Sequence, residues 1–323
     1  MNQNIRAHSG QTFKILGKQK AVIAILLIFI FMLFPDTSFY TATNLHNLLA
    51  AVSTNAIIAF GVTLAVICKG CDLSVGSVMA MAGIVAILLI NSGMNMGLAI
   101  LIAIGSGALV GFVNGFLIVH QKTEAFIITL GMGMLIQGVA LLLTNAVNVS
   151  AQNPNFQRIA NDNLLMIPNI ATIMLILGVL TFLLLRFTNF GRNVYALGGD
   201  YEVAEHSGIN VVRTKWIAFI ITGAFAAVAG VLAASRMNTG IPIAGVEIPL
   251  MVNCGVVLGG TSFAGGVGGV TRSFIGIFLL FLLSNSLGML GIDPFTQQLI
   301  RGIIIVLIIS LDCYTIKRRK EAV

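Results

Sequence analysis

Long apolar segments separated by short polar ones follow each other along almost the whole chain. Several of them reach the roughly 20 residues that a helix needs to cross the core of a bilayer. The period-two alternation of a membrane β-strand is missing, so helices, which satisfy their own backbone hydrogen bonds in lipid, are favoured. The pattern predicts an all-α, polytopic transmembrane bundle of about ten spans, at residues 21–34, 48–67, 78–90, 98–119, 125–143, 166–185, 216–234, 248–258, 274–290 and 299–311.

Glycine-rich stretches interrupt two of the apolar segments. The string GVTL at residues 61–64 precedes a break at 69–77, and GVVL at 255–258 precedes a break at 259–269. Each break is followed by a further apolar run, which predicts two weakly repeated halves with glycine-interrupted helices. In transporters, such paired interruptions indicate the transport path. The alternative is a chance similarity between glycine-rich membrane helices.

The polar stretch from Gly191 to Arg213 separates two apolar segments. Its core predicts one short helix, because Asp200 can serve as N-cap, Glu202 lies in the first turn and Gly208 can end the helix. From these residues alone the stretch is either an ordinary solvated loop or a helix that docks a soluble partner.

The composition limits the class of protein. Of the 323 residues, 57% are hydrophobic and 9% are charged, whereas soluble domains carry about 25% charged residues. The chain therefore cannot cover a water-facing surface. We expect one transmembrane domain at residues 21–312 with a loop at 188–215, preceded by a segment at 1–20 and followed by a basic tail at 313–323.

The net charge of +7 is distributed unevenly. Positive residues are kept on the cytoplasmic side of membrane proteins, and here they cluster before the first span, around the 188–215 loop and at the C-terminus. This distribution argues against nucleic-acid binding and predicts that the loop and both termini are cytoplasmic. The first apolar run lacks a small-residue cleavage site, so we expect it to be a retained span.

Motifs for chemistry are missing from the sequence. It contains no phosphate-binding loop, no H-E-x-x-H string and no nucleophile elbow. The pair Cys68 and Cys71 has redox or metal spacing, but no second pair completes a site, so no metal is expected. The few acids do not form a proton relay. We therefore expect no enzyme activity and no cofactor on this chain, and any energy must come from a partner.

Polar side chains at or near membrane depth are candidates for a translocation path or gate. Amides can hydrogen-bond a polyhydroxyl solute, although they also commonly join packed helices. Asp72 is costly in lipid, and a cap at the start of the following helix is the preferred explanation over contact with substrate. The candidates are Asn55, Asp72, Ser74, Asn114, Asn253 and Asn285.

Arg236 and Glu247 bracket a loop that the topology places outside. They can form a surface ion pair, which would be energetically minor, or contact a docking protein.

Six strings in fixed order carry a family resemblance: GCDLSVGS at 70–77, AFIITL at 125–130, GRNVYALGG at 191–199, SGIN at 207–210, GGTS at 259–262 with glycines at 265–266, and NSLGMLG at 285–291. Over residues 44–311 the chain resembles the permease subunits of bacterial ABC importers for monosaccharides of the ribose, xylose, galactose and allose group. Asn253 and Cys254 stand where relatives usually have small apolar residues, which leaves the sugar open.

The resemblance implies an inner-membrane permease subunit that works by alternating access. Its implied partners are an ATP-binding cassette subunit, which holds ATP and Mg²⁺, a periplasmic sugar-binding protein and a second permease subunit, identical or paralogous. The coupling helix of such importers matches the segment 199–208, whose candidate contacts with the ATPase are Gly199, Asp200, Tyr201, Glu202, Ala204, Glu205, Ser207 and Gly208.

Other functions stay open at this point. Related ABC permeases for nucleosides or branched-chain amino acids share the architecture. A self-sufficient channel or secondary transporter would need no partner, but the missing acid pairs in the membrane argue against it.

Overall fold

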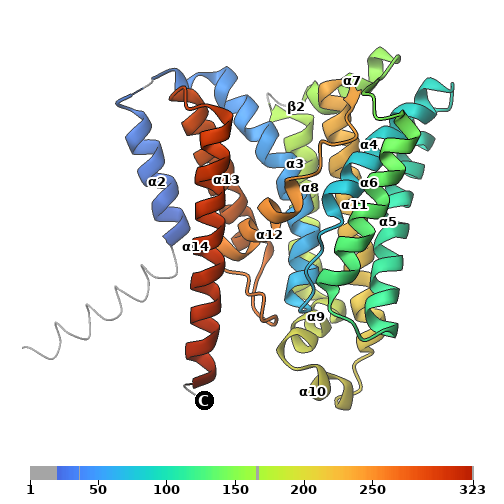
Figure 1. The fold of residues 1–323 in the computed structure, drawn as a ribbon, viewed down its shortest axis with the longest axis vertical. Helices are drawn as coiled ribbons and strands as arrows, with labels where there is room; N and C mark the ends of the chain where they lie inside the picture. Colours follow the sequence, from blue (N-terminus) through green and yellow to red (C-terminus); the bar gives the residue numbers. More distant parts are fainter. Residues whose placement is uncertain (1–19, 36, 165–166, 322–323) are drawn as a thin grey trace, which may run out of the picture.

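The computed structural model describes residues 20–35, 37–164 and 167–321, so most of the predicted segment 1–20 lies outside the described residues. Every predicted apolar segment falls on a helix (Figure 1). Within the described residues, six helices are long and apolar enough to cross a membrane: α3 (Ala42–Ile67), α5 (Met96–His120), α6 (Ala125–Thr144), α8 (Asn169–Phe187), α11 (Val211–Met237) and α13 (Val270–Met289).

Three further apolar helices are shorter: α2 (Lys20–Met32), α4 (Val75–Asn91) and α12 (Ile248–Leu258). With 11 residues and a rise of about 1.5 Å per residue, α12 extends only about 16 Å, roughly half of the bilayer core. The helix α14 (Pro294–Glu321) packs against α12 and α13 and continues through most of the predicted basic tail. The all-α fold is confirmed, and the number of spans stays a prediction.

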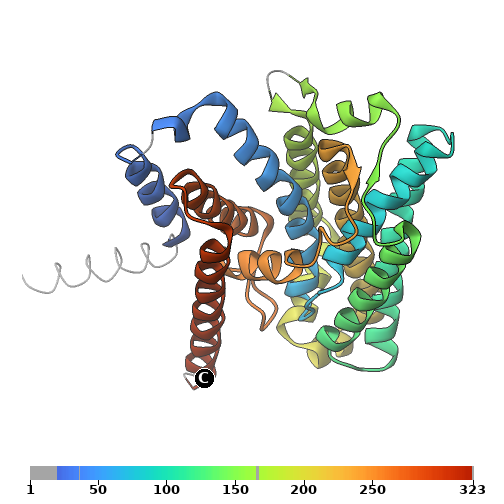
Figure 2. The same ribbon diagram turned by 45° about the horizontal axis from the view of Figure 1, so that its top comes forward.

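The centre of the bundle is formed by α3 and α11. Of the apolar part of α3, 94% is buried, against 28% for α5 and 22% for α6, so most of the surface of α5 and α6 is exposed. The helix α11 packs against α5, α4 and α3. Figure 2 shows α2, α13 and α14 on one side of α3, with α4, α5, α6 and α11 on the other.

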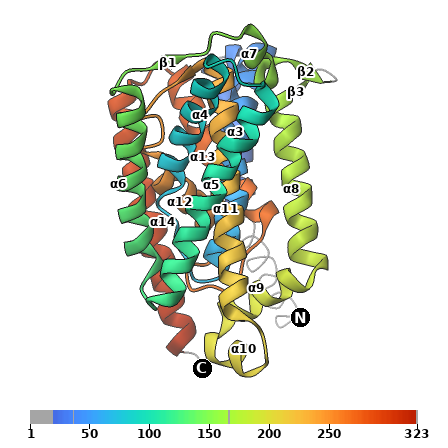
Figure 3. The ribbon, with the colours of Figure 1, turned by 90° about the vertical axis from the view of Figure 1, so that its right-hand side faces the viewer.

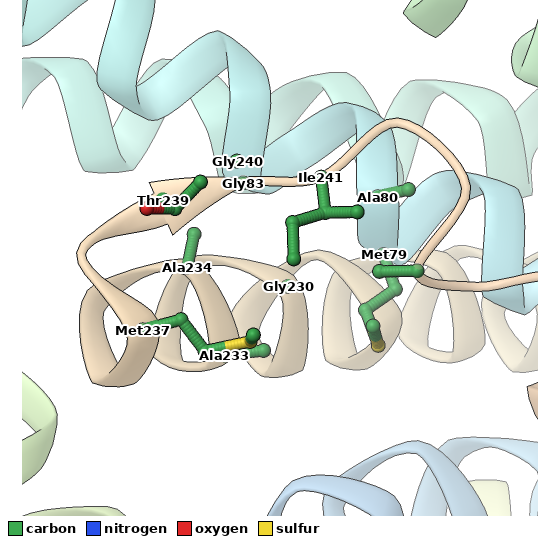
Figure 4. Close-up of a pocket in the computed structure, with 11 residues that line it drawn as sticks. Met79, Ala80, Gly83, Gly230, Ala233, Ala234, Met237, Thr239, Gly240 and Ile241 are labelled. Atoms are coloured by element: carbon green, nitrogen blue, oxygen red, sulfur yellow. The ribbon is translucent and has the colours of Figure 1, made fainter. Parts of the chain in front are cut away.

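Glycines bring the central helices into backbone contact. A Cβ added to Gly111 of α5 would lie 2.2 Å from the Phe219 carbonyl oxygen of α11, and one added to Gly230 would lie 2.0 Å from that of Met79. Gly111 and Gly230 therefore serve the close packing of these helices. Figure 4 shows the α4–α11 contact beside Gly83 and Gly230, where a gap of about 20 Å³ has room for about one water molecule.

Both predicted helix breaks are present, and they meet. The chain leaves α3 through Lys69, whose φ of 57° is left-handed, and enters α4 at Val75. The second break lies between α12 and α13 and contains Gly265 and Gly266, with φ of 82° and 69°. The Gly266 amide donates to the Ile67 carbonyl at 3.0 Å, which joins the two breaks directly.

One end of the bundle carries short elements that the sequence pattern did not predict. They are α7 (Pro154–Asn161), the antiparallel pair β1 (Val149–Ser150) and β4 (Thr239–Gly240), and the antiparallel pair β2 (Asn163–Leu164) and β3 (Ile167–Pro168) (Figure 3). The side chain of Asn153 caps α7 by accepting from the Asn155 amide at 3.0 Å, and Phe156 is fully buried. We call this the α7 end.

Candidate functional site

The opposite end is formed by two short helices, α9 (Asn189–Gly199) and α10 (Tyr201–His206), and we call it the α10 end (Figures 1 and 3). The short helix expected in the core of this stretch is present as α10, and α9 is a second helix that was not predicted. The Thr188 side chain caps α9 by accepting from the Gly191 amide at 3.2 Å. Val194, Leu197 and Gly198 are buried at helical spacing, a signal that the sequence contained and that the reading of a polar loop missed.

The predicted limits of α10 agree with the structure. The Asp200 carboxylate accepts from the Val203 amide at 3.0 Å, Glu202 lies in the first turn, and Gly208 has a φ of 79°. Ala204 is buried, whereas the side chains of Tyr201 and Val203 are 42% and 62% exposed. The helix thus presents apolar and acidic groups to the surroundings at the tip of the molecule, which suits contact with another protein.

The helix α9 connects this tip to both helix breaks. The Lys69 ammonium of the first break donates to the Gly199 carbonyl at 3.2 Å. The Tyr195 hydroxyl donates to the Gly268 carbonyl of the second break at 3.1 Å. Burial raises the pKa of Tyr195 above its ordinary value, so the phenol stays a neutral donor. Because α9 is hydrogen-bonded to both breaks, a movement of α9 would be transmitted to both.

Four of the predicted path residues lie together at the first break. Asp72 is buried, and its Oδ1 accepts from the amide and the hydroxyl of Ser74 at 2.8 and 2.6 Å. The Asn114 amide donates to the Ser74 hydroxyl at 2.9 Å, and the Asn253 amide donates to the Asp72 carbonyl at 3.0 Å. The N-cap residue of α4 is Ser74, and Asp72 accepts from Ser74 rather than from an amide within the helix, so Asp72 is not itself the cap. The group still ties the start of α4 to α5 and α12.

The other two amides lie elsewhere. Asn285 of α13 exchanges hydrogen bonds with Asn44 of α3, at 2.9 and 3.2 Å, and this is the helix-joining role that the sequence left open. Asn55 donates to the Ala51 carbonyl at 3.0 Å, and its buried Oδ1 has no partner among the described residues.

Arg236 and Glu247 do not pair with each other. Glu247 lies 3.7 Å from the Arg301 guanidinium of α14 and accepts from the Gln298 amide at 3.0 Å. The reason is that the intervening loop pairs its β4 strand with β1 and then carries Glu247 to the start of α12, beside α14. Glu247 and Arg301 are 54 positions apart in the sequence, so no local sequence pattern indicates that they pair.

A cavity of about 590 Å³ lies beside this ion pair. Its lining includes Asn55 of α3, Glu247, Phe281 of α13 and Arg301. It therefore combines a carboxylate, a guanidinium and an amide with apolar walls, a combination that can donate to and accept from a polar solute.

Comparison with known proteins identifies the family. A family profile described as "Branched-chain amino acid transport system / permease component" matches residues 44–309. The ribose import permease protein RbsC of Escherichia coli K12 is 35% identical over 92% of this chain and 94% of that protein. This chain belongs to that permease family. The resemblance predicted from the six sequence strings is confirmed, and the permease is a multi-pass membrane protein.

Other relatives of the permease carry related names. The RbsC protein of Bacillus subtilis 168 is 37% identical over 92% of this chain and 91% of that protein. The L-arabinose transport system permease protein AraH of Escherichia coli K12 is 33% identical over 93% of this chain and 90% of that protein. A solved structure titled as an inward-facing putative metal-chelate type ABC transporter aligns over 95% of this chain with a TM-score of 0.48 at 16% identity.

Proposed function

We propose that this permease is the membrane subunit of an ATP-driven importer that takes a monosaccharide from a binding protein and moves it across the bacterial inner membrane. The substrate class is supported by relatives named for ribose, L-arabinose and xylose, each aligned over more than nine-tenths of the chain. A pentose or a similar monosaccharide fits all three names, whereas the amino acids in the family description fit none of them.

The orientation follows from the basic residues. Lysines and arginines concentrate at the α10 end, and the positive-inside rule makes that end cytoplasmic. The ATPase subunit, with its ATP and Mg²⁺, then docks on α10, and the binding protein approaches the α7 end. The basic residues at the α10 end are Lys69, Lys122, Arg186, Arg192, Arg213, Lys215 and Arg272.

The observation that carries the mechanism is the contact of α9 with both helix breaks. When the ATPase subunits close, α10 moves with them, and α9 transmits the movement to the first break through Gly199 and to the second through Gly268. A shift in the relative position of α3 and α13 then changes which side of the membrane the path faces. Binding-protein delivery favours one state and ATP the other.

The cavity beside Asn55, Glu247 and Arg301 is the part of the path best suited to a sugar. Sugar hydroxyls both donate and accept, and the cavity offers a carboxylate acceptor, a guanidinium donor and the side chain of Asn55 in its lining. We therefore assign Asn55 and Glu247 to the path, with Arg301 added. The group around Asp72 is assigned a structural role.

The coupling assignment is tested by reversing one charge on α10. The Glu205→Arg permease, reconstituted with its ATPase and binding protein, should lose about tenfold or more of its ATP-driven sugar uptake, because like-charge contacts at an interface cost several kcal/mol. Glu124→Arg is the matched control, since Glu124 is an exposed carboxylate at the same end but precedes α6. Equal uptake by both variants and the unaltered permease would sink the assignment.

A further inference from the structure

Two adjoining cavities lie between α8 and α13 at the α10 end. The basic cavity, of about 480 Å³, is lined by Arg186 of α8, Arg192 and Tyr195 of α9, and Arg272 of α13. The apolar cavity, of about 300 Å³, continues along the same two helices toward the middle of the bundle. Phe182, Val270 and Thr271 line both cavities, so they share a wall.

The basic cavity has three guanidinium groups and no carboxylate in its lining. Among the described residues the ion pair that forms joins Glu247 and Arg301, neither of which lines this cavity, so no carboxylate pairs with any of these three arginines. The Arg192 guanidinium donates to the neutral Asn189 side chain, and that of Arg186 lies 5.9 Å from the Phe182 and Phe187 rings. Three like charges around one space repel each other, and a bound anion would relieve that repulsion.

The start of α13 adds to the positive potential of the basic cavity. Val270, Thr271 and Arg272 form the first turn of this 20-residue helix and line the cavity. The N-cap residue is Gly269, which has no side chain to accept from the first amides. The helix dipole therefore places partial positive charge on the same side of the cavity as the arginines.

The apolar cavity has the character of a lipid-facing crevice. Phe60 of α3, Met174 and Gly178 of α8, and Phe274 of α13 line it, and no charged residue does. Gly178 makes room, since a Cβ there would lie 3.0 Å from the Phe60 ring. Only 33% of the apolar part of α8 is buried, and Val179, which also lines the cavity, is 56% exposed. The crevice is therefore reached from the membrane.

We propose that α8, α9 and α13 bind an anionic phospholipid, with its phosphate among Arg186, Arg192 and Arg272 and an acyl chain in the apolar cavity. Planar guanidinium groups match phosphate oxygens bidentately, and basic pockets between membrane helices suit such headgroups. A free phosphate compound or an acidic side chain of the ATPase would fill the basic cavity alone. The apolar continuation favours the lipid.

The site would also act on coupling. Arg192 and Tyr195 belong to α9, the helix that contacts both breaks. A lipid bound between α8, α9 and α13 therefore stabilises α9 in its contact with Gly268, and this consequence rests on the proposed function. The proposed binding of the lipid does not depend on the proposed function.

The test measures lipid retention by the purified full-length permease in detergent, using native mass spectrometry and thermal unfolding. Phosphatidylglycerol should be retained and should raise the unfolding temperature, whereas phosphatidylcholine and inorganic phosphate at equal concentration should not. Arg192→Gln and Arg272→Gln should each weaken phosphatidylglycerol binding about tenfold, the value of one lost charge-assisted hydrogen bond. Arg213→Gln is the control, because Arg213 is exposed at the same end and outside the cavity.

Val179→Phe distinguishes a lipid from a free anion. It fills the apolar cavity and leaves the arginines in place, so it should weaken phosphatidylglycerol binding severalfold and leave any phosphate effect unchanged. Stabilisation by inorganic phosphate together with an indifferent Val179→Phe would overturn the lipid proposal. Arginine variants that retain phosphatidylglycerol as tightly as the unaltered permease, or that change the permease oligomer, would overturn it as well. No arm uses sugar or ATP, so the lipid proposal can fail while the transport proposal holds.

Discussion

The break between α3 and α4 is closed by side-chain hydrogen bonds, whereas the break between α12 and α13 is shaped by glycine backbone. At the first break Asp72, Ser74, Asn114 and Asn253 form a buried network. At the second, the left-handed Gly265 and its neighbours pass close to α9 and the end of α3. The buried Oδ1 of Asn114 has no partner among the described residues, but the other hydrogen bonds of this network restrain the first break, whereas a glycine loop bends at low cost. We infer that the first break is the more rigid of the two and call it the fixed point, and that the second bends more readily and call it the hinge.

The largest effect is expected where the hinge meets α9. Gly198→Ala places a Cβ 1.7 Å from the Ile67 carbonyl oxygen and 2.4 Å from the Gly266 nitrogen, and both atoms belong to backbone. The hydrogen bond between those two atoms would have to open, so we expect a loss of about 3 kcal/mol or more in stability and little folded permease in membranes.

Its matched control is the neighbouring glycine. A Cβ at Gly199 meets nothing within 4 Å, so Gly199→Ala should accumulate and unfold like the unaltered permease. Thermal unfolding in detergent compares the two variants. If Gly198→Ala is as stable as Gly199→Ala, the close approach of α9 to the two breaks is wrong.

The fixed point is probed at Asp72. Asp72→Ala leaves the buried amide and hydroxyl of Ser74 without their acceptor, which should cost about 1–3 kcal/mol. Asp72→Asn keeps an oxygen acceptor and should recover most of that loss. The two variants are compared by their unfolding temperatures and by sugar uptake. Uptake abolished by Asp72→Asn without loss of stability would instead place Asp72 in the path.

The structural features that could be predicted from the sequence are those that depend on neighbouring residues. The limits of α10 follow from Asp200 and Gly208, which act within one helical turn, and the apolar runs located the membrane helices because length and hydropathy are local properties. The helix α9 was not predicted, because the buried residues Val194 and Leu197 lie among the glycines and polar residues of 189–199 and give only a weak apolar pattern.

The contacts that define the site depend on long-range packing. Gly198 meets Ile67 across about 130 positions, and Glu247 meets Arg301 because the β1–β4 pair redirects the loop between α11 and α12. The predicted partner of Glu247, Arg236, instead stays near α7, where its carbonyl accepts from Asn161 at 3.1 Å. The charges and the spacing of the residues in the sequence do not predict that loop geometry.

The smallest effect is expected at the link between α9 and the hinge. Tyr195→Phe removes the hydrogen bond to the Gly268 carbonyl and leaves the ring, so stability should fall by about 1 kcal/mol near pH 7. The uptake obtained per ATP hydrolysed should also fall, because the hinge then follows α9 less closely. Tyr201→Phe is the control, since Tyr201 is 42% exposed and lies on α10, away from Gly268.

The pH dependence of the Tyr195→Phe effect tests the burial of this phenol in the folded permease. Burial raises the pKa of Tyr195 in the folded permease above the ordinary value of about 10. A raised pKa means that the stabilising neutral form is fully present below pH 10, and that its contribution is lost as the pH rises through the folded value. The stability difference between the unaltered permease and Tyr195→Phe should therefore be constant from pH 6 to about 9 and shrink above about 10. A difference that persists unchanged at alkaline pH would contradict the burial of the phenol that accompanies its contact with Gly268.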